Sequence, residues 1–499
     1  MPYSPSVPPC ARRPRPSRRL RSALTGTAVA LTAGALLGAA LPDALPDARP
    51  AGLGDRLFPG LGNPGYDVGS YDISFDYSGH NTDPLDARTV IDARVTAPGG
   101  LSRFNLDFAG GSVRSVEVNG RTAAHARAKE DLVVAPAQRL AFGQHLHIVV
   151  RHTSTTGGGK TGGWVRTRDG LAMANQADAA HRVFPGNDHP SDKAQFTFRV
   201  RAPRGYTVVA GGLPAGRERT ARHTVWTYRS DHPLATELAQ VSIGRSAVLR
   251  RTGPHGLPVR DVVPRSEAAA LRPWLKQTPA QIAWLERRLG RYPFGAYGLL
   301  IADATTGFEL ETQTLSLFER DLFRSGAGPA WYRKSLMVHE LTHQWFGDSV
   351  TPERWDDLWL NESHATWYEW LYGQHSGGPS LERRARSAYW HSDTWRKRYG
   401  PPARLRPARH DDKIDIFRPI VYDGSAVVLY ALRQKIGEEA FGRLERAWLA
   451  RHRDGNASTA DFVRLASAVY GRDLGGFLHA WLYGAKTPPM PGHPDWHSS

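Results

Sequence analysis

The stretch VHELTHQWFG, residues 338–347, places two histidines four positions apart, with a glutamate directly after the first. Residues four apart share one face of an α-helix, so His339 and His343 can point at the same atom if this stretch is helical. A catalytic zinc site takes three protein ligands and a water molecule, and neutral imidazole is a common ligand. With 20 histidines in 499 residues, about one such pair is expected by chance, and an ordinary polar helix face would show the same spacing. A third ligand must therefore lie nearby before the motif indicates a metal.

Glu362 is the strongest candidate for that third ligand. Eighteen residues separate it from His343, and it opens a second helical stretch. A hairpin of two helices can return its carboxylate to the histidine pair. His364, Asp356 and Asp357 are alternative ligands, but His364 is two positions from Glu362 and would face nearly the opposite side of a helix.

Residues 1–40 have the composition of a secretory signal peptide. Six arginines precede an uncharged run that ends in small residues, and cleavage is expected after Ala40. The run is nearly long enough to span a bilayer, so an uncleaved membrane anchor is the alternative. Because the run is rich in Ala, Gly and Thr and poor in Leu and Ile, we expect a secreted protein with no stable membrane span after signal removal.

Removal of this segment changes the charge and the cysteine content. The full chain has a formal net charge of +16, with 64 basic and 48 acidic residues. Loss of six arginines leaves 58 basic residues, a charge of about +10. The basic residues are neither clustered nor interleaved with aromatic ones, which argues against binding to nucleic acid. The one cysteine, Cys10, leaves with the signal, which excludes a disulfide or a catalytic thiol in the mature chain.

The pattern of the chain changes near residue 256. Residues 41–66 are rich in Pro, Gly and Asp, which is typical of a flexible lead-in. Within residues 67–255, short alternating segments such as YDISFDY and QFTFRV are broken by Gly, Pro and Asn. This pattern predicts an antiparallel β domain.

Apolar residues recur at helical spacing from residue 256 to residue 490, and residues 491–499 form a tail. Two strands are expected within 297–318. Helices are expected within 267–290, 334–347, 364–373, 425–437, 440–453, 459–471 and 477–484. The predicted fold class is α+β, with a β domain followed by a mostly helical domain.

The segment HELTHQWFGDSVTPERWDDLWLNE resembles the aminopeptidase N and leukotriene A4 hydrolase family of gluzincin zinc metallopeptidases. It has the family's zinc helix, its WFG, its D-L-W-L-N-E and its eighteen-residue spacing. The resemblance implies one Zn²⁺ per chain, with His339, His343 and Glu362 as ligands and Glu340 as general base. It covers roughly residues 66–490 and implies a saddle-like N-terminal β domain and a thermolysin-like catalytic domain.

The stretch VYDGSAVVLYAL resembles the family's tyrosine segment. The resemblance implies that Tyr422 donates a hydrogen bond to the oxyanion of the tetrahedral intermediate, with Ser425 where the family usually has Gly. A core tyrosine on an amphipathic helix is the alternative. NESH also departs from the usual NEGF, so Ser363 and His364 are expected to alter the pocket wall.

Two further stretches resemble the family's substrate-binding regions. GFELETQT aligns with the exopeptidase strand and places Glu311 where the family's substrate-amine glutamate lies, with Phe308 and Thr312 in place of Gly and Asn. An exposed strand glutamate is the alternative. ANQADAAHRVFPGNDHPSDKAQFTF resembles the end of the family's β domain and places Gln176 at the pocket for the substrate end.

The resemblance therefore implies a secreted zinc aminopeptidase that acts on peptides with a free N-terminus. Larger members of the family continue into a further sandwich and a helical domain, whereas this chain resembles the short secreted bacterial forms. The alternatives are a zinc endopeptidase or other hydrolase of the same fold, and a catalytically inactive surface binding protein with a structural zinc. Three ligands with a base and a tyrosine argue against the inactive binding protein, because a structural zinc site is completed by four protein ligands.

Overall fold

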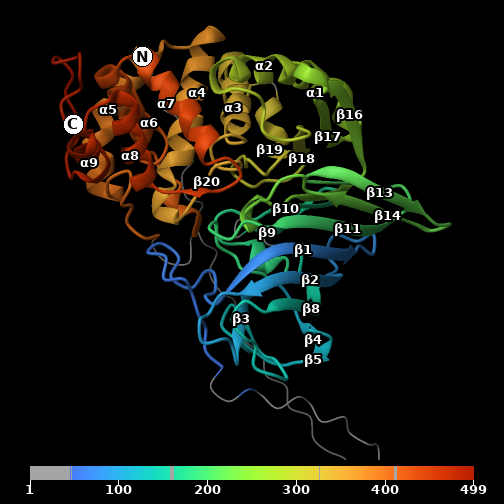
Figure 1. The fold of residues 1–499 in the computed structure, drawn as a ribbon. Helices are drawn as coiled ribbons and strands as arrows, with labels where there is room; N and C mark the ends of the chain where they lie inside the picture. Colours follow the sequence, from blue (N-terminus) through green and yellow to red (C-terminus); the bar gives the residue numbers. More distant parts are fainter. Residues whose placement is uncertain (1–44, 46–47, 158–161, 325, 409–412) are drawn as a thin grey trace, which may run out of the picture. The chain divides into compact units, whose positions relative to one another are not determined.

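Strands form most of the first part of the chain, and helices form most of the last part. In Figure 1 the strands are therefore mainly blue to green and the helices mainly yellow to red. The structure is a computed structural model that describes residue 45 and residues 48–157, 162–324, 326–408 and 413–499. The expected signal peptide, residues 1–40, lies outside the described residues. Among the described residues, every helix is too short or too polar to cross a bilayer.

The largest sheet has eight strands in the order β13-β14-β11-β1-β2-β8-β4-β5. In that order they span Leu213–Arg219, His223–Arg229, Gln195–Pro203, Tyr66–Asp76, Leu85–Val95, His145–Ser154, Val113–Val118 and Arg121–Thr122. Alternate residues of β1, among them Tyr71, Ile73 and Phe75, are buried on the core face, as period-two patterning requires. This alternation is the pattern from which the β domain was predicted.

The predicted antiparallel pairing is wrong at one position, because β1 and β11 run parallel, with Ile73 opposite Phe198. The connection through residues 175–194 delivers β11 to the same end of the sheet at which β1 begins, so Gln195 lies opposite Ser70. The other strand pairs of this sheet are antiparallel. The sheet is therefore mixed.

Two smaller sheets complete the strand-rich part. One has the order β3-β7-β6, with strands Phe104–Asp107, Asp131–Ala135 and Ala124–Ala128. The other has the order β12-β15-β10-β9, with strands Thr207–Ala210, Val241–Gly244, Gly170–Ala174 and Gly163–Thr167. Strand β10 ends two residues before Gln176, so this sheet sets the position of that side chain.

A fourth sheet, β16-β17-β18-β19, joins the strand-rich part to the helical part. Its strands span Ser246–Thr252, Pro258–Pro264, Leu299–Ala302 and Ser316–Glu319. The last two confirm the strand pair expected within residues 297–318. The expected domain boundary at 255/256 falls in the turn between β16 and β17, which pair along their whole length.

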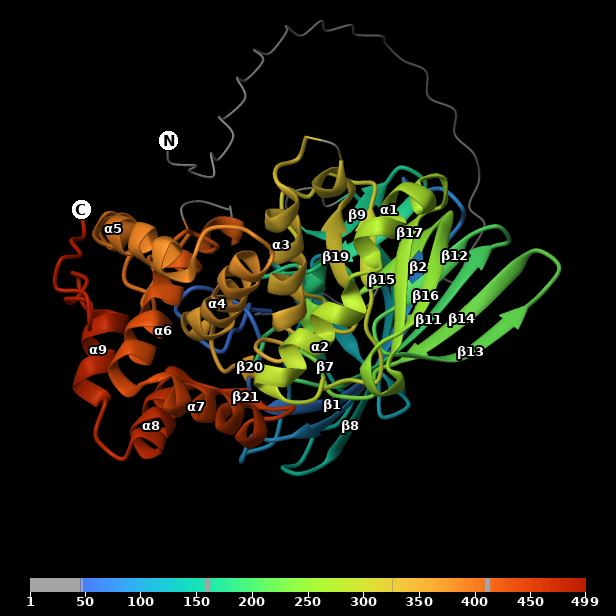
Figure 2. The same ribbon diagram turned by 90° about the horizontal axis from the view of Figure 1, so that it is seen from above.

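Nine α-helices follow in the described part of the chain, and they lie above the eight-stranded sheet in Figure 1. Figure 2 looks down on them, with α5 to α9 together on the left. The helices α1 to α9 span Ala268–Leu275, Thr278–Leu289, Ala330–Thr342, Trp359–His375, Leu381–Tyr399, Asp423–Ile436, Glu438–Arg451, Thr459–Tyr470 and Gly475–Tyr483. All seven expected helical stretches are helical, and the first is divided at Lys276 and Gln277, ahead of Pro279 in the first turn of α2. Helix α5 was not expected.

Helix α4 lies at the centre of the helical part, where it packs against α3 and α6. Its buried residues run around the whole helix and include Trp359, Trp367 and Trp370. A helix that is apolar on all sides belongs in a core. This arrangement holds the first turn of α4, which carries Glu362, against the end of α3, which carries the histidine motif.

Part of the segment expected as a flexible lead-in packs against the helical part. Phe58 is buried and its ring meets Trp355 edge-on, with ring centroids 5.4 Å apart. Asp55 accepts a hydrogen bond of 2.9 Å from the backbone amide of Trp355. Residues 55–61 therefore belong to the folded core in this structure.

Candidate metal centre

The two motif histidines lie at the C-terminal end of α3. His339 and Glu340 are in its last turn, and His343 is the residue that follows it. All three side chains are buried, with exposed fractions between 1% and 6%. The four-residue spacing therefore places both imidazoles on one face, as predicted.

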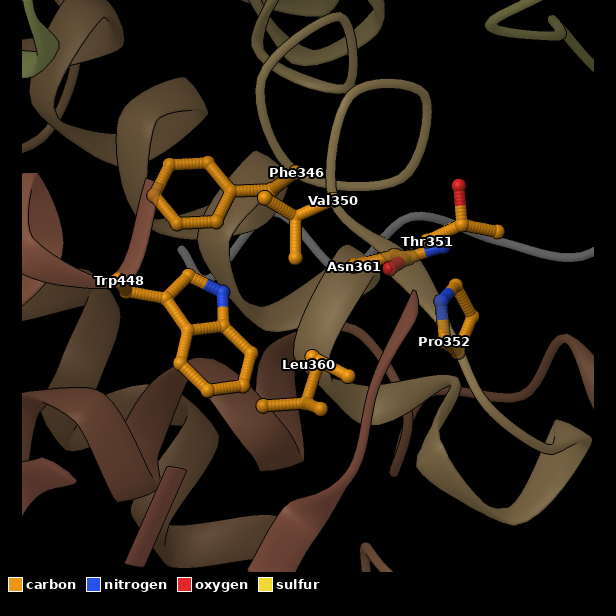
Figure 3. Close-up of a pocket in the computed structure, with 8 residues that line it drawn as sticks. Phe346, Val350, Thr351, Pro352, Leu360, Asn361 and Trp448 are labelled. Carbon is orange, nitrogen blue, oxygen red and sulfur yellow. The ribbon is translucent and has the colours of Figure 1, made fainter. Parts of the chain in front are cut away.

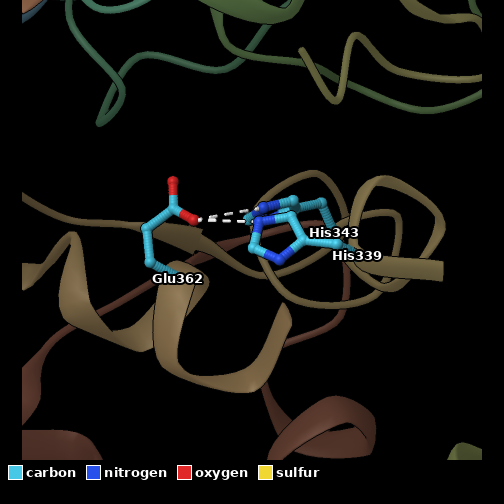
Figure 4. A group of neighbouring side chains, drawn as sticks. All are labelled: His339, His343 and Glu362. Atoms are coloured by element: carbon cyan, nitrogen blue, oxygen red, sulfur yellow. Dashed lines mark ion pairs between the residues drawn. The ribbon is translucent and has the colours of Figure 1, made fainter. Parts of the chain in front are cut away.

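The Glu362 carboxylate meets this pair. Its Oε2 atom lies 3.3 Å from Nε2 of His339 and 3.4 Å from Nε2 of His343 (Figure 4). The structure thus brings together the three predicted ligands, and their ligand atoms lie within 4.8 Å of one another. They come from two helices that pack side by side, α3 and α4.

The second nitrogen of each imidazole has its own partner. His339 Nδ1 donates a hydrogen bond of 3.2 Å to Glu369 Oε2, and Glu369 is in turn paired with Arg384 at 2.9 Å. His343 Nδ1 donates a bond of 3.1 Å to the backbone oxygen of Phe346. Because Nδ1 carries the proton in each ring, both Nε2 lone pairs are left to face Glu362.

A divalent cation fits between these three atoms. No hydrogen-bond donor among the described residues reaches Glu362 Oε2, although the atom is buried. A tetrahedral ion with ligands at about 2.0–2.1 Å would separate those ligands by about 3.3–3.4 Å. The two Nε2 to Oε2 distances are 3.3 and 3.4 Å. Neutral imidazoles and one carboxylate also form a donor set that zinc prefers.

The alternative third ligands lie elsewhere. His364 donates a 2.7 Å hydrogen bond to the backbone oxygen of Leu360 and stacks on Phe346, and it is not part of the three-atom group. Asp356 is paired with Arg56. Asp357 accepts hydrogen bonds from the backbone and hydroxyl of Thr459, at 2.9 and 2.6 Å.

Tight apolar packing holds the turn after His343 against α4. Phe346, Val350, Leu360 and Trp448 surround a gap with no space for a water molecule (Figure 3). This contact fixes the backbone of Phe346, whose carbonyl orients the His343 ring. Packing at this turn therefore sets the orientation of the His343 ring.

Glu340 and Tyr422 flank the three ligands without joining them. Glu340 Oε2 is buried and has no hydrogen-bond partner among the described residues. Burial raises the pKa of Glu340, and the nearby His339 and His343 oppose this only in part. Tyr422 lies directly before α6, and its ring centroid is 5.9 Å from that of His339. Burial, followed by the charges of Glu362 and the neighbouring carboxylates, raises the pKa of Tyr422 well above its usual value.

Glu311 lies beside the same group, but not in a strand as expected. Only Leu310 forms a bridge, with Leu317, after which a turn with Thr314 at φ 66° reverses the chain. Gln344, two residues after the end of α3, holds this turn, because its side chain donates a 2.9 Å bond to the Glu311 carbonyl and accepts one of 2.8 Å from the backbone amide of Thr314. Ligand atoms of Glu311, Glu340 and His343 lie within 4.8 Å of one another.

Gln176 reaches this site from the strand-rich part. Its side-chain amide donates a hydrogen bond of 2.6 Å to Glu311 Oε1. The two residues assigned by resemblance to the substrate end are thus in direct contact. The Glu311 side chain is only 3% exposed.

Sequence reasoning missed three polar residues that orient the site: Glu369, Arg384 and Gln344. Glu369 follows Glu362 by seven residues, two helical turns, and this spacing could have placed it beside a ligand. Arg384 comes from the unexpected helix α5, so no local signal linked it to the site.

A second buried group, Asp178, His181 and Asp188, also has ligand atoms close together. His181 Nδ1 donates a 2.7 Å hydrogen bond to Asp188 Oδ2. Burial alone would lower the pKa of His181, but the carboxylates of Asp188, Glu130 and Asp178 together outweigh it and raise the pKa to about 10. This favours a buried ion pair in the strand-rich part.

The comparison with known families identifies the helical part. Residues 281–481, which contain the three converging ligands, match the peptidase family M1 domain. This is a peptidase family M1 domain. The resemblance to the aminopeptidase N family of gluzincins is thereby confirmed.

The curated relatives that this chain matches are longer than it is. Aminopeptidase N of Streptomyces lividans is 28% identical over 436 residues, which cover 83% of this chain and 50% of the relative. Leucyl aminopeptidase of Saccharolobus solfataricus is 25% identical over 348 residues, covering 66% and 42%. The chain thus spans half or less of the length of these two relatives.

Solved structures match this chain over nearly their full length. The M1 zinc metallopeptidase of Deinococcus radiodurans has a TM-score of 0.72 and 25% identity, covering 88% of this chain and 99% of that one. A mutant of that metallopeptidase bound to a Tyr-Ser-Ala substrate has a TM-score of 0.73 and 25% identity, covering 89% and 100%. The predicted fold class is confirmed, and zinc is the expected cofactor.

Proposed function

We propose that this chain is a zinc-dependent aminopeptidase that removes the first residue from peptides with a free N-terminus. The observation that carries the proposal is the convergence of His339, His343 and Glu362, with the buried carboxylates of Glu340 and Glu311 beside them. The relatives named above are aminopeptidases, and one solved neighbour holds a peptide substrate. These names support the same activity here.

The residues of this chain divide the chemistry among them. A zinc ion held by His339, His343 and Glu362 would supply a Lewis acid that polarises the scissile carbonyl and lowers the pKa of water. Glu340, one residue after a ligand, accepts the proton of the attacking water and returns it to the leaving amine. Tyr422 keeps its proton because its pKa is raised, so its hydroxyl can donate to the developing oxyanion.

Glu311 and Gln176 form the proposed anchor for the substrate amine. A carboxylate of Glu311 held by the Gln176 amide presents a fixed negative charge to a free ammonium group. A charge-assisted hydrogen bond contributes about 1.5–3 kcal/mol, or about 10–150-fold in kcat/KM. Such an anchor would separate an aminopeptidase from an endopeptidase of the same fold.

Hydrolysis of leucyl 4-nitroanilide and of its N-acetylated form tests the proposal. The zinc-loaded protein should cleave the free-amine substrate at least about tenfold better, lose activity in a chelator and recover it with added zinc. Glu311→Gln should remove most of this preference, whereas Glu439→Gln, which removes an exposed charge on α7, should not. Equal cleavage of both substrates would favour the endopeptidase alternative. No cleavage by the zinc-loaded protein would favour the inactive binding protein.

We also propose that the protein is secreted. The proposal rests on the arginines and the uncharged run of residues 1–40. Sequencing of the N-terminus of the protein from the culture medium should give a chain that begins at Leu41. Recovery of the uncleaved chain in the membrane fraction would favour the anchor.

A further inference from the structure

Glu309 is a half-buried carboxylate beside the candidate metal centre that the proposed chemistry does not use. It stands two positions before Glu311. Among the described residues, no basic side chain forms an ion pair with it. Burial, followed by the charge of Glu319, raises the pKa of Glu309 to about 7. A buried acid without a cationic partner is costly unless a ligand provides the cation.

The local backbone puts Glu309 and Glu311 on the same side of the chain. Leu310, between them, exchanges two backbone hydrogen bonds with Leu317 of β19, at 2.9 and 2.7 Å, and its side chain is fully buried. In such an extended pairing, successive side chains point to opposite faces. Since Leu310 points into the core, Glu309 and Glu311 both point towards the site, about 6.6 Å apart along the chain.

Glu309 is less buried than Glu311 and lies near the residues of the reaction centre. Its charge helps to raise the pKa values of Glu340, Tyr422 and Tyr332. Tyr332 is half-buried on α3, two turns before His339. Glu309 therefore lies near the general base and near Tyr332 in the first turn of α3, whereas Glu311 is buried more deeply.

A bound peptide would cross these two positions in order. If Glu311 holds the amine of the first residue, the scissile carbonyl lies next to Glu340 and the three metal ligands. The second residue of an extended peptide lies about 3.3 Å beyond the first, so a long second side chain comes within reach of a carboxylate about 6.6 Å from the amine anchor.

We propose that Glu309 selects substrates with a basic second residue, by pairing with the lysine or arginine that follows the scissile bond. The inference rests on the proposed aminopeptidase function, because the register of the peptide is set by its amine at Glu311. It adds the substrate class, which the chemistry of the reaction centre leaves open.

Three tripeptides that differ only in the second residue test the inference: leucyl-lysyl-glycine, leucyl-glutaminyl-glycine and leucyl-glutamyl-glycine. The zinc-loaded wild type should rank them in that order by kcat/KM. The lysyl peptide should exceed the glutaminyl one by about fivefold, the size expected for a partly exposed charge pair. The preference should shrink as salt rises from about 0.05 to 0.5 M, because screening weakens the pair.

The variants separate a specificity role from a structural one. Glu309→Gln should bring the lysyl-to-glutaminyl ratio close to one, and Glu309→Lys should reverse the ranking in favour of the glutamyl peptide. Glu439→Gln removes the same charge from an exposed site on α7 and should keep the wild-type ratio. A merely structural role would lower all three rates together and leave their ratio unchanged.

Two results would overturn the inference while the proposed function stands. One is a wild type that releases leucine from all three peptides at equal rates. The other is a Glu309→Gln variant that keeps the preference. If the Glu309 variants do not fold, a preference in the wild type that does not change with salt overturns the inference as well. Failure of the proposed function itself would appear differently, as equal cleavage of free and N-acetylated leucyl 4-nitroanilide or no cleavage at all.

Discussion

The side-chain amide of Gln176 donates a hydrogen bond of 2.6 Å to Glu311 Oε1, although 135 positions separate the two residues in the sequence. Gln176 follows strand β10 of the strand-rich part, and Glu311 precedes β19 of the fourth sheet. The strand-rich part therefore supplies a wall of the site as well as a scaffold. Changes to the sheet that carries Gln176 should alter substrate binding before they alter metal binding.

Removal of the third ligand should release the metal. Glu362→Gln replaces the carboxylate that faces both Nε2 atoms, so zinc content and activity should fall together. His364→Gln should keep zinc, because that ring is held by Leu360 and Phe346. Elemental analysis of the purified variants checks both expectations. Full zinc content in Glu362→Gln would require a different third ligand.

Removal of the general base should separate metal binding from turnover. Glu340→Gln keeps the size of the side chain but cannot accept the proton of water. Its zinc content should match the wild type, while kcat on leucyl 4-nitroanilide falls by about 10²-fold or more. A variant that keeps more than about a tenth of the wild-type kcat would contradict the assignment of the base.

Removal of the Tyr422 hydroxyl should lower kcat. Tyr422→Phe deletes one proposed donor to the oxyanion, so kcat should fall by about 10²–10³-fold with little change in KM. Tyr430→Phe is the matched control, because this buried tyrosine lies on α6, the helix that follows Tyr422, and its hydroxyl contacts His493. Equal activity of Tyr422→Phe and the wild type would make Tyr422 a core residue.

The carboxylate behind His339 should set the strength of metal binding. Glu369→Ala removes the group that fixes the His339 ring and leaves Arg384 unpaired, so the Kd for zinc should rise by about 10–100-fold. Competition with a chelator measures the change. Glu382→Ala, an exposed acid on α5, should bind zinc as the wild type does. An unchanged Kd would mean that the imidazole is oriented by its packing alone.

The buried pair of His181 and Asp188 should make stability depend on pH. The pKa of His181 is raised from about 6.5 to about 10, so its contribution to the free energy of unfolding is present below pH 6.5 and is lost as pH rises towards 10. The wild type should therefore lose more stability between pH 7 and 9.5 than His181→Gln does. Urea unfolding at both pH values measures this difference, with His479→Gln on the surface of α9 as the control. Parallel losses in the wild type and His181→Gln would mean that His181 is uncharged.

Most of the helical part could be predicted from the sequence, because its helices have apolar residues at helical spacing. Helix α5 could not, because Tyr389 is the one large residue on its buried face, which otherwise consists of Ala385, Ala388, Ser392 and the hydrogen-bonded Arg396. The parallel pairing of β1 with β11 could not either, since alternation in a strand fixes which face is buried and not which neighbour it has.

In the candidate site, too, some positions could be predicted from the sequence and others could not. The converging ligands follow from local geometry, because two histidines share a helix face and Glu362 opens the next helix. The position of Glu311 could not be predicted from local geometry. A turn with Thr314 in a left-handed conformation and a hydrogen bond from Gln344 hold Glu311 outside any strand. The position of Glu369 depends on how α3 packs against α4, which spacing along one helix does not determine.

The parallel pairing of β1 with β11 has a consequence for how the chain folds. Arg199 on β11 pairs with Asp72 on β1 across 127 positions of sequence, so one edge of β1 stays open until most of the strand-rich part has been synthesised. Contacts between residues so far apart slow folding, and an open strand edge is a template for aggregation. Truncated chains that end before Gln195 should therefore aggregate, and the full chain should gain from a chaperone that covers β1 until β11 arrives.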